Sequence, residues 1–580
     1  MDERIERNLL KVQKPARYIG GEWNSVCKEW TAGRVKVALC FPDVYEIGMS
    51  YLGLKIIYGL LNERDDALCE RSFAPWHDME AVMRAEGIKL YGLESKRPLS
   101  EYDIVGFSFA YELNYTNCLN MLDLGGIPKK SAERSDGDPL VIAGGPSCFN
   151  PEPMADFIDA FVIGEGEEVI NEVVDAYKDS RACGQRRAGR AELLRKLAGI
   201  EGVYVPSLYS VSYDEKGALL GFIPKEGAPA RIRKRSVADL NSSYYPTKQV
   251  VPYIQIVHDR ISVEIMRGCK NFCRFCQAGA TYRPKRERSR EKIIELAKET
   301  YRNTGYDEIS LISLSSGDHS QIKETMQSLN GEFSGRAVSI SFPSLRIENI
   351  VDELPFLIAG VKKSGLTFAL ESGSHRLREM VNKNINIDKL ISVVTEAYKA
   401  GWKRIKLYFM IGLPTETEAD LAEIVKLIER VSLLKKALDG HPAHVHVSIS
   451  SFIPKPHTPF QWEVMADTEE LKKKKAFLIS AVRKKRLDAK LDFHDFSRSI
   501  LEGVFSRGDR RLSGVVLKAW EKGARFDSWA ELFNMSFWLD SFADSRLDPA
   551  DFVYKRKEAK DALPWGFLDT GLNIGPSKRG

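Results

Sequence analysis

The chain has no cysteine in the 304 residues that follow position 276, so this part cannot hold an iron–sulfur cluster through its own thiolates. It also lacks any apolar run of about eighteen residues, which excludes a membrane-spanning helix. Its first residues lack the apolar core of a secretory signal. A net charge of +5 neither requires nor excludes a nucleic-acid partner. From these absences we expect a cytoplasmic protein with free thiols rather than structural disulfides.

Three of the nine cysteines lie close together, at Cys269, Cys273 and Cys276 of the segment MRGCKNFCRFCQAG (266–279). A structural zinc site needs four closed ligands, and the fourth is missing here. A 4Fe–4S cluster held by three thiolates leaves one iron open to a substrate or cofactor. The loop is polar, which disfavours simple buried thiols. The spacing therefore predicts a 4Fe–4S cluster, with zinc as the alternative.

Short β-branched segments alternate with helical patterns from 251 to 465. A helix is expected near 289–303, with Ser289 as its N-cap. This alternation predicts parallel βα units and a partial (β/α)6 barrel of the TIM type, whose chemistry lies at the carboxyl ends of the strands. The six expected strands are 262–266, 308–315, 338–343, 366–371, 404–411 and 444–451.

The strand and helix pattern of the first 200 residues predicts a different α/β unit, a doubly wound Rossmann-like sheet. Such sheets bind cofactors at the carboxyl ends of their strands. No GxGxxG follows the first strand, which argues against a dinucleotide site, and the glycines at 144–145 and 164–166 follow later strands. We expect an amino-terminal segment (1–33), the Rossmann-like domain (34–200), a hairpin connector (201–250), the barrel (251–465) and a mostly helical region (466–580).

The cysteine spacing, with Phe275 before the last cysteine, resembles the CxxxCxΦC motif of the radical S-adenosylmethionine superfamily. There the open iron binds the methionyl group of S-adenosylmethionine, and the aromatic residue lies beside the adenine. The segment 316–318 stands in place of the family's Gly-Gly-Glu, which is itself absent. The resemblance implies contacts to S-adenosylmethionine by Phe275, Ser316, Gly317, Asp318, Arg346, Glu371, Gly412, Leu413, Pro414 and Glu416.

The first domain resembles the cobalamin-binding domain that precedes the barrel in many members of this superfamily. The family's DxHxxG reads Asp43-x-Tyr45-x-x-Gly48 here, so tyrosine replaces the histidine that would bind cobalt. The resemblance therefore implies base-off cobalamin without a protein imidazole; a domain that has lost the cofactor is the alternative. The remaining implied cobalamin contacts are Ser108, Gly144, Gly145, Gly164, Glu165 and Gly166.

Residues 30–570 are similar to a group of cobalamin-binding radical proteins with the motifs YIGGEWNS, SLSSGD, FPSLR and PKPHTPFQW. The resemblance implies reductive cleavage of S-adenosylmethionine to a 5′-deoxyadenosyl radical, and methylation at an unactivated carbon of an unidentified substrate. A cobalamin-dependent radical rearrangement or cyclisation is the next hypothesis. Methylthiolation of RNA or protein, and a non-catalytic cobalamin or cluster sensor, also stay open.

The cluster implies an external one-electron reductant of the flavodoxin or ferredoxin type. The basic segments 471–486 and 283–290 are either solvated faces or RNA contacts. Tyr111, Glu112 and His319 flank expected strand ends and are candidates for orienting the substrate.

Overall fold

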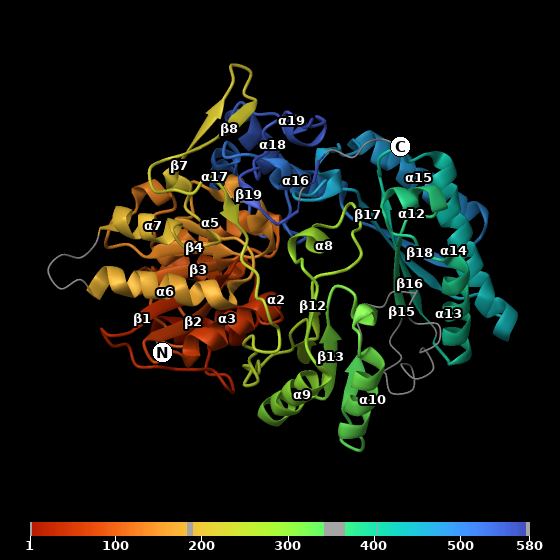
Figure 1. Ribbon diagram of the computed structural model, residues 1–580, viewed down its shortest axis with the longest axis horizontal. Helices are drawn as coiled ribbons and strands as arrows, with labels where there is room; N and C mark the ends of the chain where they lie inside the picture. Colours follow the sequence, from red (N-terminus) through yellow and green to blue (C-terminus); the bar gives the residue numbers. More distant parts are fainter. Residues whose placement is uncertain (1–2, 183–188, 342–365, 403, 573, 576–580) are drawn as a thin grey trace.

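The computed structural model describes residues 3–182, 189–341, 366–402, 404–572 and 574–575 (Figure 1). Arg346 and Cys183 lie outside the described residues, as does the end of the expected strand 338–343. In Figure 1 the amino-terminal α/β unit lies on one side, the later parallel strands lie on the other, and the carboxyl-terminal helices lie along the top.

The first domain is a six-stranded sheet in the order β2-β1-β3-β4-β5-β6. All neighbours are parallel except β5 and β6. Strands β1, β3, β4 and β5 are largely apolar, as expected where both faces of a parallel sheet are covered, whereas the edge strand β2 also carries Glu70, Arg71 and Ser72. The predicted Rossmann-like sheet is therefore present. Its strands are β1 (Val35–Phe41), β2 (Ala67–Phe73), β3 (Ile104–Ser108), β4 (Leu140–Gly144), β5 (Ala160–Val162) and β6 (Val203–Tyr204).

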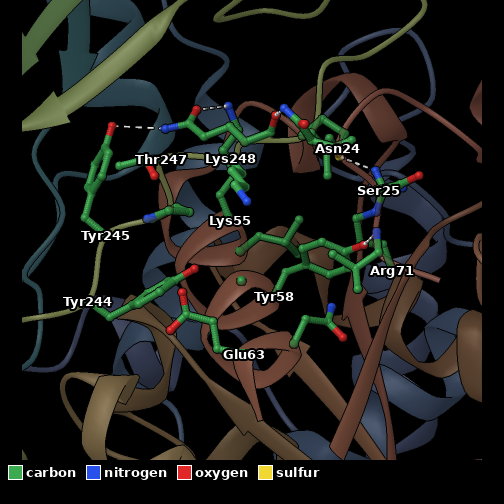
Figure 2. Close-up of a pocket in the computed structure, with 18 residues that line it drawn as sticks. Asn24, Ser25, Lys55, Tyr58, Glu63, Arg71, Tyr244, Tyr245, Thr247 and Lys248 are labelled. Carbon is green, nitrogen blue, oxygen red and sulfur yellow. Dashed lines mark hydrogen bonds between the residues drawn. The ribbon is translucent and has the colours of Figure 1, made fainter. Parts of the chain in front are cut away.

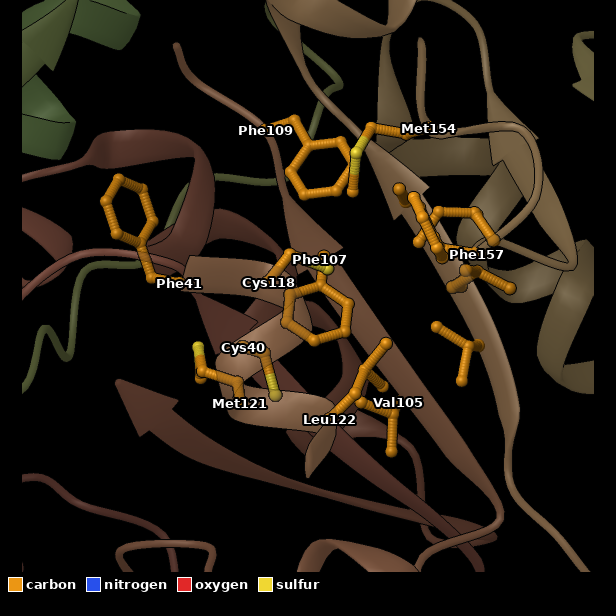
Figure 3. Packing of buried hydrophobic residues seen from close by; sticks show 14 of the residues in the cluster. Cys40, Phe41, Val105, Phe107, Phe109, Cys118, Met121, Leu122, Met154 and Phe157 are labelled. Carbon is orange, nitrogen blue, oxygen red and sulfur yellow. The ribbon is translucent and has the colours of Figure 1, made fainter. Parts of the chain in front are cut away.

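Helices cover both faces of this sheet because successive side chains of a strand point in opposite directions. The helices α3 (Leu52–Glu63) and α6 (Gly166–Ala182) contact each other on one face. Helix α5 (Tyr115–Gly125) packs on the other, where Cys118 and Leu122 meet Cys40, Val105 and Phe107 (Figure 3). Helices α4 (His77–Glu86) and α7 (Arg190–Ala198) complete the domain.

The connector contains the predicted hairpin. Strands β7 (Tyr209–Tyr213) and β8 (Leu219–Pro224) pair antiparallel around Asp214–Gly217, and Gly217 has a φ of +77°. Glycine adopts this left-handed conformation without steric cost.

The second half contains two parallel sheets. One has the order β10-β13-β14, with β10 (Ile261–Glu264), β13 (Glu308–Ile312) and β14 (Ser339–Ser341). The other has the order β15-β16-β17-β18, with β15 (Leu366–Glu371), β16 (Ile405–Ile411), β17 (Val445–Ser451) and β18 (Ala489–Phe493). Described parts of all six expected strands are present. Strand β18 is additional, and it extends the sheet beyond the boundary expected at residue 465.

The helices between these strands are α9 (Arg290–Thr304), α10 (Ile322–Glu332), α12 (His375–Met380), α13 (Ile387–Lys399), α14 (Glu418–Asp439) and α15 (Thr468–Lys484). The hydroxyl of Ser289 accepts a hydrogen bond from the Lys292 amide at 3.2 Å, so the expected N-cap of α9 is confirmed. The basic segment 471–486 forms most of α15, whose Leu471 and Leu478 are buried in the barrel core. Helix α15 thus connects the parallel strands β17 and β18, whereas the sequence placed it in a separate helical region.

The last helices belong to the core of the first domain. They are α16 (Phe496–Arg507), α17 (Leu512–Glu521), α18 (Met535–Asp544) and α19 (Ala550–Val553). One continuous hydrophobic cluster contains Cys40 and Phe107 of the sheet together with Val504, Val515 and Trp538 of these helices. Strand β19 (Leu568–Asp569) also pairs with β9 (Ile232–Arg233) of the connector. The carboxyl-terminal helices therefore complete the hydrophobic core of the amino-terminal domain.

Among the residues that the structure describes, no helix has both the length and the apolar character needed to cross a bilayer.

Candidate functional site

The cysteine loop lies between β11 (Met266–Arg267) and α8 (Gln277–Thr281). Cys273 is buried, and Cys269 and Cys276 are half-buried. Cys276 caps α8, where its Sγ accepts a hydrogen bond from the Gly279 amide at 3.3 Å. Burial raises the pKa of the Cys276 thiol. A metal ion would oppose this effect, because it binds the thiolate.

The three thiols suit a cluster better than a single ion. Within the described ranges, no three His, Cys, Asp or Glu side chains converge as ligands for one metal ion. A four-iron cluster is held by individual thiolates around its edge, so its ligands need not meet at one point. None of the three cysteines forms a disulfide, and all lie on one polar loop. The donor set therefore fits a 4Fe–4S cluster with three protein ligands.

The loop after β13 contacts the cysteine loop through Asp318. The Asp318 carboxylate accepts a hydrogen bond from Asn271 Nδ2 at 2.7 Å and pairs with Lys270 Nζ at 2.9 Å. Beside it, Ser316 is fully buried and donates to the Leu311 carbonyl at 3.1 Å. The segment 316–318, with Gly317 half-buried between these residues, therefore lies against the predicted cluster site.

The end of α12, the helix that follows β15, and the loop after β17 also contact the cysteine loop. The Arg274 amide donates to the Val381 carbonyl at 3.0 Å, and Asn382 Nδ2 donates to the Phe272 carbonyl at 2.7 Å. From the loop after β17, the Phe460 amide donates to the Arg274 carbonyl at 3.1 Å. The carboxyl ends of β10, β13, β15 and β17 thus meet at one place, as expected for the active edge of a barrel.

The remaining described residues predicted to contact S-adenosylmethionine lie around this loop. Glu371, with a φ of +64°, accepts a hydrogen bond from Lys383 at 2.7 Å, and the charges of both act on the Cys276 thiol. Leu413 lies in a small apolar cluster against which Phe275 packs. The half-buried Pro414 follows it.

Glu416 is held in place by two partners. It accepts a hydrogen bond from the Gly412 amide at 2.8 Å and pairs with Lys474 of α15 at 2.7 Å. Burial raises the pKa of Glu416. No local pattern connects the basic helix with this site, so Lys474 was missed by the reasoning from sequence.

A cavity of about 570 Å³ lies between the first domain and the barrel. Its barrel side is formed by residues that lead into the cysteine loop, including Arg267 and Gly268. Its Rossmann side includes most of the predicted cobalamin contacts, namely Ser108, Gly144, Gly145, Gly164, Glu165 and Gly166. Two segments predicted to serve different cofactors therefore open onto one space.

The inner part of this cavity lies between the sheet and the helices α3 and α6, and it is apolar. Leu39, Ile57, Gly106, Ile142 and Ile170 form its wall. The glycines at its edge permit close packing of the backbone: a Cβ atom on Gly145, where φ is +114°, would lie 2.7 Å from the Phe109 carbonyl oxygen. The cavity thus has a deep apolar part and a rim built from backbone, which fits a bulky ligand with a long substituent.

Asp43, Tyr45 and Gly48 lie away from the described walls of this cavity. The hydroxyl of Tyr45 donates to the Glu22 carboxylate at 2.8 Å, and Trp529 Nε1 donates to Asp43 at 2.9 Å. A Cβ atom on Gly48 would lie 2.3 Å from the ring of Phe73. These three residues therefore stabilise the loop after β1, whereas the later Ser50 and Tyr51 reach the cavity.

An ion-pair network joins the two sides of the cavity. Arg267 pairs with Glu165 at 3.0 Å and with Glu167 at 2.7 Å, and Arg286 pairs with Glu165 at 2.7 Å. Burial acts to raise the pKa of Glu165, but the hydrogen bond from Arg286 and the charge of Arg267 hold it below its usual value. Gly164, Glu165 and Gly166 of this turn were predicted as cobalamin contacts, but the ion pairs of Glu165 and Glu167 with the barrel were not predicted.

The basic segment 283–290 is occupied by intramolecular contacts. Arg286 takes part in the network above, and Arg288 is buried and donates to the Glu264 carbonyl at 3.0 Å. These two side chains form neither a solvated face nor an RNA-binding surface.

The three candidates for orienting a substrate also have partners. Tyr111 donates to Glu502 at 2.7 Å, and Glu112 accepts from Lys455 at 2.8 Å. The ring of His319 lies 2.9 Å from the Arg288 carbonyl oxygen, so this nitrogen acts as a donor.

Four of the earlier cysteines are packed as small apolar side chains. Cys40, Cys69, Cys118 and Cys148 are buried in the core of the first domain, and Figure 3 shows Cys40 and Cys118 among aromatic and aliphatic residues. Cys27 is exposed. The described cysteines before the cysteine loop therefore form no second cluster site.

Two family models match different parts of the chain. Residues 263–428 match the family model of the radical SAM superfamily, and residues 53–206 match the model of the amino-terminal part of radical SAM proteins. The chain thus carries a radical S-adenosylmethionine domain that contains the cysteine loop.

Two relatives cover different shares of the chain. An uncharacterized protein of Methanocaldococcus jannaschii is 28% identical over 82% of this chain and 89% of its own length. A tRNA-2-methylthio-N(6)-dimethylallyladenosine synthase of Syntrophomonas wolfei is 27% identical over 29% of this chain and 40% of its own length. The similarity to the synthase therefore covers less than half of that enzyme.

A solved structure shares the overall fold. The radical S-adenosylmethionine methyltransferase TsrM from Kitasatospora setae, with cobalamin and a 4Fe–4S cluster bound, superposes with a TM-score of 0.51 at 13% identity. The match covers 74% of this chain and 78% of that one.

Proposed function

We propose that this protein is a cobalamin-dependent radical S-adenosylmethionine enzyme that methylates an unactivated carbon of its substrate. The observation that carries the proposal is the 570 Å³ cavity, because it joins the glycine-rich Rossmann rim to the strand that enters the cysteine loop. A substrate held there would lie between the two cofactors. The shared fold with TsrM, whose structure contains both cofactors, supports the proposal.

When bound, the cluster supplies the electron that cleaves S-adenosylmethionine to methionine and a 5′-deoxyadenosyl radical, and cobalamin supplies the methyl group. Cys269, Cys273 and Cys276 would hold the cluster. Phe275 and Leu413 would bind the adenine, and Asp318 would fix the cysteine loop through Asn271.

The chain's other contribution is to shape the cobalamin site. The apolar wall around Gly106 and Ile142 would take the nucleotide tail, and the rim formed by Gly144 and Gly145 would lie against the corrin side chains. Because Tyr45 is hydrogen-bonded to Glu22, it is not free to act as a cobalt ligand, which supports binding without the usual histidine.

The electron would come from an external carrier of the flavodoxin or ferredoxin type. Lys270 on the cysteine loop keeps about half of its side chain exposed (55%), and acidic carriers bind basic surfaces. An iron–sulfur protein with free thiols suits a reducing compartment, which supports the cytoplasm.

Methylthiolation has less support. It would require an additional cluster held by amino-terminal cysteines, and four of these are buried in the apolar core.

The test is anaerobic turnover. Protein reconstituted with iron, sulfide and cobalamin is reduced, supplied with S-adenosylmethionine and assayed for 5′-deoxyadenosine. We expect product and about four irons per chain from the wild type. Cys273→Ala should lose the product at least 100-fold and bind less iron, whereas Cys27→Ala, which alters an exposed cysteine outside the loop, should match the wild type.

Full iron content with no 5′-deoxyadenosine in cell extract, which contains candidate substrates, would contradict the proposal. Production of 5′-deoxyadenosine without S-adenosylhomocysteine would retain the radical enzyme and refute methylation.

A further inference from the structure

A second cavity, of about 450 Å³, lies on another face of α3 (Figure 2). Its walls come from the amino-terminal segment 24–26, from α3 and from the connector segment 244–250. Leu54 borders both cavities, but the other α3 residues divide between them. The helical period explains this: Lys55, Tyr58 and Asn62 share one face of α3, and Gly53, Ile57 and Leu61 share another.

The walls of this cavity are held by specific contacts. Asn24, at the end of the YIGGEWNS motif, donates to the carbonyls of Gln249 and Asn303, each at 2.9 Å. The hydroxyl of Tyr58 accepts a hydrogen bond from the Val26 amide at 2.8 Å. The YIGGEWNS motif and the Val26 that follows it therefore join the connector to α3 around this space.

Arg71 is the one wall charge that is fully neutralised within the part of the chain that the structure describes. Its guanidinium pairs with Glu22 and with Glu94, each at 2.7 Å, and all three side chains are 1% exposed. Arg71 therefore needs no further anion.

Lys55 is different, because its buried ammonium group forms no ion pair with any described residue; the charge of Asp259 acts on it from beyond ion-pair distance. The residue is 8% exposed. The hydrogen bond that its Nζ makes is to the neutral amide oxygen of Gln249, at 3.3 Å. The nearby Glu63 is exposed and hydrogen-bonded to Tyr244. Burial lowers the pKa of Lys55 to about 8, so the group is still largely protonated at neutral pH.

We propose that this cavity binds a small organic or inorganic anion whose carboxylate or phosphate pairs with Lys55. A buried charge is stable when it is paired, and the unpaired ammonium lines a space of the size that proteins use for small ligands. Tyr58 and Tyr244 provide aromatic walls for the rest of the ligand (Figure 2). The site is independent of the cobalamin proposal, because the two cavities have different polar walls.

The test measures anion binding to the full-length protein. Benzoate represents a carboxylate and inorganic phosphate represents a phosphate; each is titrated at constant ionic strength while the melting temperature is recorded. We expect a saturable rise with one of the two, and its loss in Lys55→Met. Lys216→Met, which removes an exposed hairpin lysine, should keep the wild-type response.

A second measurement follows the rate at which Lys55 reacts with a water-soluble acylating reagent at pH 8, read by peptide mass spectrometry. The bound anion should slow this reaction at least fivefold and leave the rate at Lys216 unchanged. Lys55→Met should also keep its cluster, its cobalamin and its melting temperature without anion. The proposal is overturned if neither anion stabilises the wild type, or if Lys55→Met responds equally.

Discussion

Asp527 is a carboxyl group enclosed at the junction of the carboxyl-terminal helices and α5. It is fully buried and accepts hydrogen bonds from Trp538 Nε1 at 3.0 Å and from the Thr116 hydroxyl at 2.9 Å. Burial raises the pKa of Asp527 to about 6. At neutral pH the protein therefore carries an ionised carboxylate whose burial is compensated, among the described residues, by neutral donors and by the more distant Arg525.

This shift predicts a pH-dependent difference between the wild type and Asp527→Asn. Between pH 4 and 6 the folded state keeps the proton that the unfolded state has lost, so this group's contribution to stability falls as the pH rises. The loss is up to about 3 kcal/mol for a shift of roughly two units. We expect the melting temperature of Asp527→Asn, relative to the wild type, to increase from pH 4.5 to 7.

The exposed Asp540 supplies the control, because Asp540→Asn should follow the wild type at each pH. A constant offset between Asp527→Asn and the wild type across this range would show that Asp527 titrates normally.

Some functional residues could be predicted from the sequence and others could not. The three cysteines could be recognised because metal ligation imposes a short spacing within one loop. The hydrogen bond that holds Tyr45 away from the larger cavity could not be predicted, because its partner Glu22 lies on a different segment and no local pattern connects the two residues. The same holds for Lys55, which occupies an ordinary helical position.

At the scale of elements, the strands of both sheets could be predicted from their apolar runs and from the turns that follow them. Strand β18 was missed because its sequence, AKLDF, is short and follows a helix whose lysines suggested a solvated surface. Its pairing with β17 depends on the crossover of α15 rather than on any strong preference of its own residues.

The apolar wall of the larger cavity gives a prediction at this scale. A Cβ atom on Gly106 of β3 would lie 3.5 Å from Ile142, an ordinary contact, so the strand accepts a larger residue there. The valine side chain of Gly106→Val should fill the space proposed for the nucleotide tail. Because the ligand then no longer fits, bound cobalamin should fall from about one per chain to less than about 0.2.

The measurement is the visible spectrum of the reconstituted protein. Valine favours strands, so the melting temperature of the cobalamin-free protein should not fall. Gly106→Ala is the graded control and should retain most of the cobalamin. Full binding by a folded Gly106→Val would refute this placement of the tail.

At the scale of the whole molecule, the network of Glu165, Arg267 and Arg286 joins the first domain to the barrel beside the cysteine loop. Removing Arg286 takes one of two arginine partners from the buried Glu165, so the cost should be smaller than the ~3–5 kcal/mol of a buried charge left with no partner. We expect Arg286→Met to lower the melting temperature and to increase cleavage of the connector by protease, because Glu165 then keeps only Arg267 and the Val237 amide.

Arg233 provides a matched comparison, since its pair with Glu201 at 3.6 Å is exposed. Arg233→Met should change stability by less than about 0.5 kcal/mol. Equal behaviour of the two variants would mean that the network does not hold the domains together.

The packing of the carboxyl-terminal helices on the first domain was the largest feature that could not be predicted from the sequence. Helical periodicity identifies α16 to α18 as amphipathic, but it does not say which surface they cover. The structure places them on the first domain, where Asn150 of that domain donates to the carbonyls of Phe505 and Gly508 at 3.0 and 2.9 Å.

This packing affects how the first domain folds during translation. The ribosome releases the first domain long before the helices that complete its core, so that domain emerges with a large apolar surface and must wait for about 300 further residues. Its folding cannot finish until α16 to α18 have been made. The larger cavity needs both the finished sheet and the barrel, so it too forms only after α16 to α18 have been made.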